Sequence, residues 1–359
     1  MPFKDPNMGE RRLLIVGPLP SEKYKNYGGT TVLMQNFKDF LDSNGYYYVF
    51  LKTSFFGKFN FGKFGNALDL IYLFVAFLYK LRNVDIVMFN FSNRGFVHVL
   101  PFLVRVAYFF KKKIVIRKFA GSVEVFWNKL SERKKRQLTK MFSHSDLIFQ
   151  ETRNGITYLQ ELTKEPLNIE WFPNVRKPYL NAIKVRSIKP KRFAFISLIT
   201  KTKGVDELLE AASQLPKDYI VDFYGRIDNQ EYDKSAFEGY EHVSYKGALD
   251  SKDVLPTLQK YDMLVLPSYS EGYPGIIIEA FSAGISVIAT DVGGIPEIVT
   301  HRQNGILVCP RSAKALENAM LSISEDEYGR LSKNAFDSFN LHFNSDKIND
   351  SIYRKIISL

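Results

Sequence analysis

The sequence has little cysteine and no long apolar run. Cys309 is the only cysteine among 359 residues, so no internal disulfide can form and a reducing compartment is the simpler expectation. The most apolar segment, Leu68–Tyr79, is 12 residues long, whereas a helix that spans a bilayer needs roughly 20. We therefore expect an ordinary buried helix there. The first ten residues hold no apolar core of signal-peptide length, so export is not expected.

Signals for a bound metal are also missing from the sequence. The five histidines have no ligand-like spacing, and neither a zinc pattern nor a D-x-D motif occurs. A Ser-His-Asp set cannot be assembled from the sequence either. We therefore expect neither a tightly held divalent metal nor a resident cofactor.

Positive charge exceeds negative charge, with 49 Lys and Arg against 38 Asp and Glu, a net charge of +11. Such an excess favours nucleic acid, a lipid surface or a phosphorylated substrate as partner, and nucleic acid is not expected because no recognised reading module is present. In Phe55–Phe64, Lys58 and Lys63 lie among phenylalanines, which predicts a loop in the interface of an anionic membrane. The alternative is a flexible loop before a helix. Lys111–Lys113 and Arg133–Arg136 add positive charge in the same half.

Short apolar runs alternate with longer segments of helical periodicity along the chain. This alternation predicts a doubly wound α/β fold with parallel strands. The runs expected to form strands are Arg12–Gly17, Tyr46–Leu51, Val84–Phe89, Ile114–Ile116, Leu147–Phe149, Ile169–Phe172, Arg192–Ser197, Tyr219–Tyr224, Val243–Lys246, Met263–Leu266, Ser286–Ala289 and Ile306–Val308. One helix is expected over Phe96–Phe110. A lapse in periodicity at Lys177–Lys191 predicts a linker between two domains.

The stretch Ser268–Gly284 (SYSEGYPGIIIEAFSAG) carries the strongest candidate site. It is expected to run from a strand end through a loop into a helix, where Gly272 and Gly275 let a diphosphate approach unpaired N–H groups. Glu271 in the loop and Glu279, about two turns into the helix, are then placed to accept hydrogen bonds from a ribose and a sugar. The alternative is that Glu271 caps the helix and Glu279 is a solvated helix residue.

Together with Val287–Val299 and Gly305–Val308, this stretch resembles the donor-binding core of the family 4 retaining glycosyltransferases. Their E-x7-E motif matches Glu271 and Glu279. The resemblance implies the GT-B architecture, with two Rossmann-like doubly wound domains facing a cleft and a C-terminal helix returning to the first domain. The implied domains are an acceptor-binding domain of residues 1–180 with the tail 341–359, and a donor-binding domain of residues 181–340.

By the same resemblance, Glu271 and Lys203 are the catalytic candidates. Lys203 ends the segment Phe193–Gly204, which is similar to the family's G-R-L-x-x-x-K-G, and is expected to neutralise the leaving diphosphate. Glu279 is expected to hold the ribose. Further donor contacts are expected from Gly272, Tyr273, Pro274, Gly275, Gly28 and Gly29, and from Arg226 and Lys201 as substitutes for a missing phosphate cation.

The sequence departs from the family pattern at two places. Ser197 and Leu198 stand where the family has a glycine and an arginine, so one of two phosphate cations is missing. Arg117 and Phe119 replace the histidines of a segment that often reads H-x-H-G-G-S, and a phenylalanine cannot hydrogen-bond a donor sugar. The segment Trp171–Asn174 (WFPN) resembles the family's P-N motif, and we expect it to set hinge geometry.

The resemblance implies transfer of a sugar, with retention at the anomeric carbon, from a nucleotide diphosphate donor, with UDP-sugar favoured over GDP-sugar. The cationic first half suggests a lipid-linked saccharide acceptor, in bacterial O-antigen, capsule or lipopolysaccharide synthesis. The expected location is cytoplasmic and peripheral on the inner face of the cell membrane. Two alternatives stay open: a non-catalytic sugar-nucleotide-binding scaffold of a polysaccharide assembly complex, and a GT-B sugar-nucleotide epimerase. Leu198 favours the scaffold, and the presence of both glutamates favours the transferase.

Overall fold

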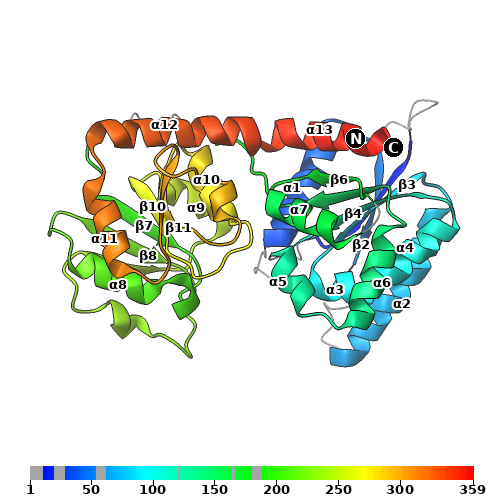
Figure 1. The fold of residues 1–359 in the computed structure, drawn as a ribbon, viewed down its shortest axis with the longest axis horizontal. Helices are drawn as coiled ribbons and strands as arrows, with labels where there is room; N and C mark the ends of the chain where they lie inside the picture. The colour runs from blue at the N-terminus through cyan, green and yellow to red at the C-terminus, as the bar shows by residue number, and fades with distance from the viewer. Residues whose placement is uncertain (1–10, 20–28, 54–61, 120–121, 164–165, 180–187) are drawn as a thin grey trace. The chain divides into compact units, whose positions relative to one another are not determined.

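The chain forms two compact units (Figure 1). Unit 1 consists of Met1–Asn174 together with Ser345–Leu359, and unit 2 of Val175–Asn344. The computed structural model describes residues 11–19, 29–53, 62–119, 122–163, 166–179 and 188–359. Unit 2 is therefore inserted, in sequence, between two parts of unit 1, and each unit is built around its own sheet.

Unit 1 contains a six-stranded parallel sheet in the order β2-β1-β3-β4-β5-β6. Its strands are β1 (Leu13–Gly17), β2 (Tyr48–Lys52), β3 (Ile86–Phe91), β4 (Lys113–Lys118), β5 (Leu147–Gln150) and β6 (Ile169–Trp171). These are the six strands predicted for this half, with ends shifted by one or two residues. Apolar runs identify them because both faces of a parallel sheet are covered by helices.

Successive residues of β1 point to opposite faces of this sheet, as the two-residue period of a strand requires. Leu14 and Val16 pack under helices on one face, and Leu13 and Ile15 pack with helices on the other. The helices of the first face include α2 (Gly62–Leu81), α3 (Asn93–His98), α4 (Leu100–Phe109), α5 (Val123–Asn128), α6 (Glu132–Phe142) and α7 (Arg153–Leu162). Those of the second are α1 (Gly29–Ser43) and α13 (Ser345–Ile357), so the C-terminal helix belongs to unit 1.

Unit 2 contains a second six-stranded parallel sheet, in the order β12-β11-β10-β7-β8-β9. Its strands are β7 (Arg192–Ile196), β8 (Ile220–Tyr224), β9 (Val243–Gly247), β10 (Met263–Leu266), β11 (Val287–Thr290) and β12 (Gly305–Val308). All six were predicted. With β7 counted as the first strand, the order is 3-2-1-4-5-6, that of the Rossmann fold.

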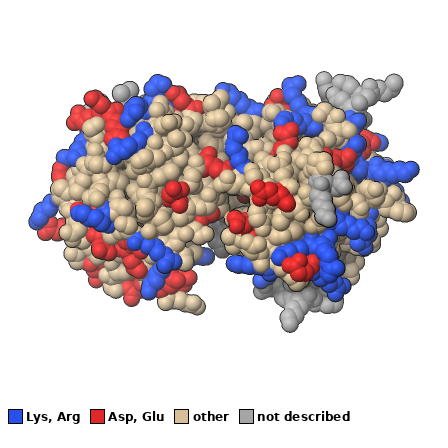
Figure 2. Space-filling view, viewed as in Figure 1, with Lys and Arg blue, Asp and Glu red and all other residues tan. Residues whose placement is uncertain are grey.

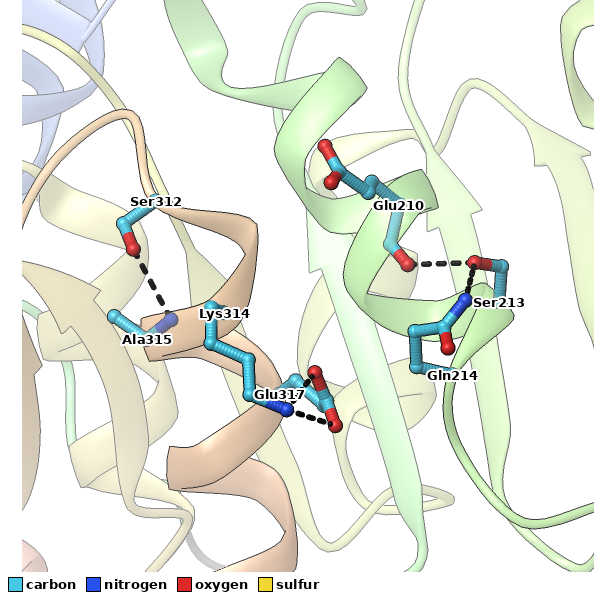
Figure 3. A network of polar contacts seen from close by, with 7 residues as sticks. All are labelled: Glu210, Ser213, Gln214, Ser312, Lys314, Ala315 and Glu317. Carbon is cyan, nitrogen blue, oxygen red and sulfur yellow. Dashed lines mark hydrogen bonds and ion pairs between the residues drawn. The ribbon is translucent and has the colours of Figure 1, made fainter.

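The helices of unit 2 are α8 (Val205–Ser213), α9 (Val254–Leu258), α10 (Gly275–Ser282), α11 (Ala313–Ser322) and α12 (Glu325–His342). α8 and α11 lie side by side, and α10 packs against α12. Figure 3 shows how α11 begins: the Ser312 hydroxyl accepts a hydrogen bond from the Ala315 N–H at 3.1 Å. Lys314 and Glu317 then form an ion pair in the first turns of the same helix, at 2.8 Å. Such caps and pairs fix where a helix begins.

One predicted helix is wrong in its extent. The segment Phe96–Phe110 was expected to be a single helix, but α3 ends at His98 and α4 begins at Leu100. Pro101 explains the break, because it has no N–H to donate to the preceding turn and its ring crowds that carbonyl. In the first turn of α4 the missing N–H costs nothing.

The predicted burial of Leu68–Tyr79 is also wrong for half of that segment. The segment lies within α2, where Leu73 and Phe77 are buried in the core. Ile71 and Val75 on the opposite side are 62% and 61% exposed. The helix contributes one face to the core and presents a second apolar face that no described element covers.

The predicted interfacial loop lies mostly outside the described residues. Of Phe55–Phe64, residues 55–61 are outside them, and the rest form the start of α2. None of the helices in the described part of the chain combines the length and the apolar character needed to cross a membrane.

Candidate functional site

Two loops meet at the carboxyl ends of β7 and β10 in unit 2. In a sheet of this order, ligands bind where two neighbouring strands send their connections in opposite directions, and β7 and β10 are that pair. The Tyr269 N–H donates to the Thr202 carbonyl at 2.9 Å, which joins the loops. Gly204 has φ +73°, and a Cβ there would lie 2.1 Å from the Pro267 carbonyl oxygen. A glycine is therefore required where the loops cross.

The joined loops bring both predicted catalytic residues together. Lys203, at the end of η2 (Lys201–Lys203), places its Nζ 2.5 Å from Oε1 of Glu271, and both side chains are mostly buried. The Ser268 hydroxyl donates to the same oxygen at 2.7 Å. The Thr290 hydroxyl in turn donates to the Ser268 carbonyl at 2.5 Å. A cation and a carboxylate are thus held in fixed positions 68 residues apart in sequence.

The loop after Glu271 is held in place by contacts with Gly293 and Gly294. The Gly294 N–H donates to the Gly272 carbonyl at 2.9 Å. Gly293 has φ +57°, and a Cβ there would lie 1.9 Å from the Glu271 carbonyl oxygen. The segment 291–297 is thus a turn that packs on the Glu271 loop.

The predicted cradle is the start of α10. Tyr273 and Pro274 are buried, and Gly275 is the first residue of the helix. The N–H groups of a first helical turn have no intrahelical acceptor and carry partial positive charge, so they favour an anion. Glu279 is the fifth residue of α10, a little over one turn from its start, so the expected depth of two turns is corrected.

Arg176 is a residue of this site that the sequence did not indicate. Its Nε donates to Oε1 of Glu279 at 2.6 Å, and its side chain is only 13% exposed. A Cβ on Gly275 would lie 1.9 Å from the Arg176 guanidinium, so glycine makes room for the arginine. A cation beside a helix start is unfavourable by itself, and the Glu279 carboxylate offsets it. The only available signal was its place two residues after the P-N pair Pro173–Asn174.

Arg176 also lies where the chain enters unit 2. Its N–H donates to the Phe343 carbonyl at 3.0 Å, and it forms a parallel bridge with Asn344, the last residue of the unit. The entering and leaving segments therefore lie side by side. Through the Arg176 side chain, Glu279 is linked to the two adjacent segments at which unit 2 begins and ends.

The other predicted donor residues are two exposed cations of unit 2 and two glycines of unit 1, one of which is outside the described residues. Lys201 is exposed, and its N–H donates to the Glu231 carboxylate at 2.6 Å. Arg226 is exposed at the end of β8, and its carbonyl accepts from the Ile199 N–H at 3.0 Å. Leu198, in place of the family's arginine, is 39% exposed. In unit 1, Gly28 lies outside the described residues, and Gly29 begins α1 with open space around it.

The segment of unit 1 that lacks the family's histidines is a packed core segment. Phe119 is 1% exposed, and the Arg117 guanidinium lies over the Phe172 ring, 3.4 Å from its centroid. Burial lowers the pKa of Arg117 to about 9, and that of Lys118 to about 8, although Glu151 opposes both shifts. These cations pack within unit 1, and Phe119 has no polar group to offer a sugar.

Comparison with known proteins places the site within a recognised sequence family model. Residues 181–337 match the model described as glycosyl transferases group 1. A relative from Campylobacter jejuni, named N,N'-diacetylbacillosaminyl-diphospho-undecaprenol alpha-1,3-N-acetylgalactosaminyltransferase, is 35% identical over 136 residues, 37% of this chain and 36% of that protein. The putative teichuronic acid biosynthesis glycosyltransferase TuaC of Bacillus subtilis is 33% identical over 133 residues, 37% of this chain and 33% of that protein. The matches span about a third of these relatives' lengths.

Solved structures resemble the whole chain at lower sequence identity. HepE from Anabaena in complex with UDP has a TM-score of 0.72 at 16% identity, with 97% of this chain and all of that chain covered. Sucrose-phosphate synthase from Thermosynechococcus elongatus has a TM-score of 0.73 at 16% identity and the same coverage. The fold is thus the α/β two-domain GT-B fold predicted from the sequence.

Proposed function

We propose that this protein is a retaining glycosyltransferase that moves a sugar from a nucleotide diphosphate donor to a saccharide acceptor. The observation that carries the proposal is the Lys203–Glu271 pair, held 2.5 Å apart at the carboxyl ends of β7 and β10 and followed by the start of α10. A preorganised cation and a helix start provide what a departing diphosphate needs. The match of this segment to glycosyl transferases group 1 supports the assignment.

Each group of the site has a role in this proposal. The residues from Gly272 to Gly275, which lead into the start of α10, bind the diphosphate. Lys203 stabilises the negative charge that develops on the diphosphate when its bond to the sugar breaks. Glu271 accepts a hydrogen bond from a sugar hydroxyl. Glu279 accepts hydrogen bonds from the ribose through Oε2, because Oε1 is taken by Arg176. Lys201 and Arg226, both exposed, supply further positive charge toward the diphosphate.

The donor is proposed to be a UDP-sugar in preference to a GDP-sugar, and no tightly bound metal is required. The presence of UDP in the similar HepE structure supports the first point. The lack of a D-x-D motif supports the second. Residues 1–180 with the C-terminal tail are proposed to bind the acceptor, and residues 181–340 the donor.

The acceptor is proposed to be a lipid-linked saccharide, used in the synthesis of a bacterial surface polysaccharide. The diphospho-undecaprenol in the name of the Campylobacter relative supports a lipid-linked acceptor. The net charge of +11 agrees with work at the inner face of the cell membrane, where anionic lipid and diphosphate are both present.

A second candidate is a non-catalytic scaffold that binds sugar nucleotides. It is favoured by Leu198, an exposed apolar residue in place of the family's arginine. The test is a panel of UDP-, GDP-, ADP- and TDP-sugars, read as the shift in melting temperature of the purified chain without added metal. A shift for one donor, followed by release of its nucleoside diphosphate when acceptor lipid is supplied, supports the transferase. Binding without release supports the scaffold, and a folded protein that shifts with none of the donors refutes both.

A further inference from the structure

The outer faces of two helices in unit 1 carry large apolar side chains in contact with solvent. On α2 these are Leu70, Ile71, Val75 and Tyr79, and on α4 and the residue after it Phe102, Phe109 and Phe110; together they are called the α2/α4 face. The two helices lie side by side, since the rings of Phe74 and Phe102 are 5.1 Å apart (Figure 1). Phe109 is 79% exposed, the largest value in this group. The apolar residues therefore form a contiguous surface across both helices.

Positive charge borders the α2/α4 face. Arg105 is exposed on α4, and Lys111 and Lys113 are exposed directly after it. α6, which packs against α4, adds the exposed Arg133, Arg136 and Lys140. Figure 2 shows Lys and Arg side chains gathered over the helix that Figure 1 labels α6. α4 itself carries no acidic residue, and of these cations Lys113 is paired with Asp146 at 2.7 Å.

A pocket opens between the end of α4 and the turn after α6. It has a volume of about 700 Å³, and its charged lining consists of four cations, Arg105, Lys111, Lys112 and Lys113, and one carboxylate, Asp146, which pairs with Lys113 at 2.7 Å. The His144 ring stacks on Tyr108 with 4.1 Å between centroids. Desolvation and the charges of Lys140 and Arg105 lower the pKa of His144, as expected in a positive environment. The pocket thus has the size and charge to take a phosphate group.

Lys111 has an unusual backbone conformation for its residue type. It follows the C-cap residue of α4 and has φ +54°, in the left-handed region where glycine is preferred. A residue with a side chain is strained there. The chain therefore carries a cation at this position at some cost in stability.

We propose that the α2/α4 face and its basic border dock on an anionic lipid bilayer. The apolar side chains enter the interface, the cations contact lipid phosphates, and the pocket takes one headgroup phosphate. A second copy of the chain fits less well, because two such faces would bring like charges together. This inference rests on the proposed location at the membrane but not on the transfer reaction, and it places the attachment on the helices rather than on the segment Phe55–Phe64.

The test is sedimentation of the full chain with vesicles of phosphatidylcholine, with and without phosphatidylglycerol. An apolar variant, Ile71→Gln with Phe109→Gln, and a charge variant, Arg105→Gln with Lys111→Gly, are compared with the wild type. Lys111→Gly suits the backbone at that position, so folding is preserved. The control, Leu341→Gln with Lys252→Gln, changes one exposed apolar residue and one exposed lysine of unit 2.

We expect the wild type to bind only the anionic vesicles, and less at high salt. Each cation removed should lower the partition coefficient about fivefold, and the apolar variant should lower it at all salt concentrations, while the control stays at the wild-type value. Equal loss in the control, or wild-type protein that stays in solution, overturns the proposal. So does a dimer in size-exclusion chromatography that the apolar variant dissociates without any change in vesicle binding. The shift in melting temperature with nucleotide sugars is measured for each variant, and its retention separates loss of docking from loss of the donor site.

Discussion

The two units share a sheet architecture but use their surfaces differently. Of the large apolar side chains that are exposed in the described parts of the chain, nine belong to unit 1 and three to unit 2. In unit 2, the charged residues of the site are paired with one another at the strand ends. In unit 1, the charged residues border an apolar surface on the outside of the helices. One α/β scaffold thus supports an enclosed polar site in one unit and an open amphipathic face in the other.

Of all the variants, we expect the largest effect at Lys203, which belongs to the paired site of unit 2. Lys203→Gln removes the cation next to the leaving group, and donor turnover should fall by about 100-fold or more. Release of nucleoside diphosphate from the donor found in the panel is the measurement. Lys217→Gln, which breaks the surface pair with Glu241, is the control and should turn over normally. A rate for Lys203→Gln within a few fold of the wild type would remove Lys203 from the mechanism.

Two glycines with similar φ angles distinguish the cost of backbone strain from the cost of a steric clash where two loops cross. Gly204 has φ +73° and meets Pro267, whereas Gly45 in unit 1 has φ +69° and open space around it. Gly45→Ala should cost about 1 kcal/mol of unfolding free energy, and Gly204→Ala should cost at least about 2 kcal/mol more because its Cβ overlaps a carbonyl. Both tryptophans, Trp127 and Trp171, belong to unit 1, so their fluorescence reports on that unit, and circular dichroism reports on both. Equal costs at the two positions would contradict the argument.

Lys118, one of two buried cations described in unit 1, predicts that the free energy of unfolding depends on pH. Burial lowers the pKa of Lys118 to about 8, below its unfolded value, so the folded unit binds fewer protons than the unfolded chain above that pH. Relative to Lys118→Met, the wild type should therefore gain stability as the pH rises from about 8 to about 10, by at most about 3 kcal/mol. Denaturation followed by tryptophan fluorescence measures the difference. A difference that is independent of pH would show that Lys118 keeps its ordinary pKa in the fold.

The Arg176–Glu279 pair should matter for binding more than for stability. Glu279→Gln should weaken nucleotide affinity by about 10-fold, since one charged hydrogen-bond acceptor is lost. Arg176→Gln should weaken it less, and the double variant should be no worse than Glu279→Gln, because the arginine acts through the glutamate. Calorimetric titration with the donor nucleotide checks both.

Independent and additive losses at these two positions would mean that Arg176 contacts the nucleotide itself. Unchanged affinity in Glu279→Gln for every donor would mean that the ribose binds elsewhere.

The smallest effect is expected at a pair of the same kind on the surface. Asp337→Asn breaks the ion pair with Lys333 on α12, in which both side chains are more than half exposed. We expect a loss of at most about 0.5 kcal/mol and no change in donor affinity. A thermal melt with and without donor is sufficient. A larger effect on affinity here than at Glu279 would show that the variants act through the stability of unit 2 alone.

The sequence was sufficient for the strands and for the Glu271 loop, because buried parallel strands appear as apolar runs and the loop carries its glycines in place. It did not predict that Arg176 meets Glu279, since the contact joins residues 103 positions apart and depends on the space left by Gly275. The outer face of α2 was missed for a related reason. Periodicity shows that a helix is apolar on two sides but not which side finds a partner.

The side-by-side position of Arg176 and Asn344 has a consequence for biosynthesis. Unit 2 is one uninterrupted stretch of sequence, whereas unit 1 also needs Ser345–Leu359, which are synthesised after unit 2. Unit 2 can then fold during translation while unit 1 still lacks α13. Helices α2 and α4 precede unit 2 in the chain, so their apolar outer faces are synthesised early, but unit 1 lacks α13 until unit 2 has been made.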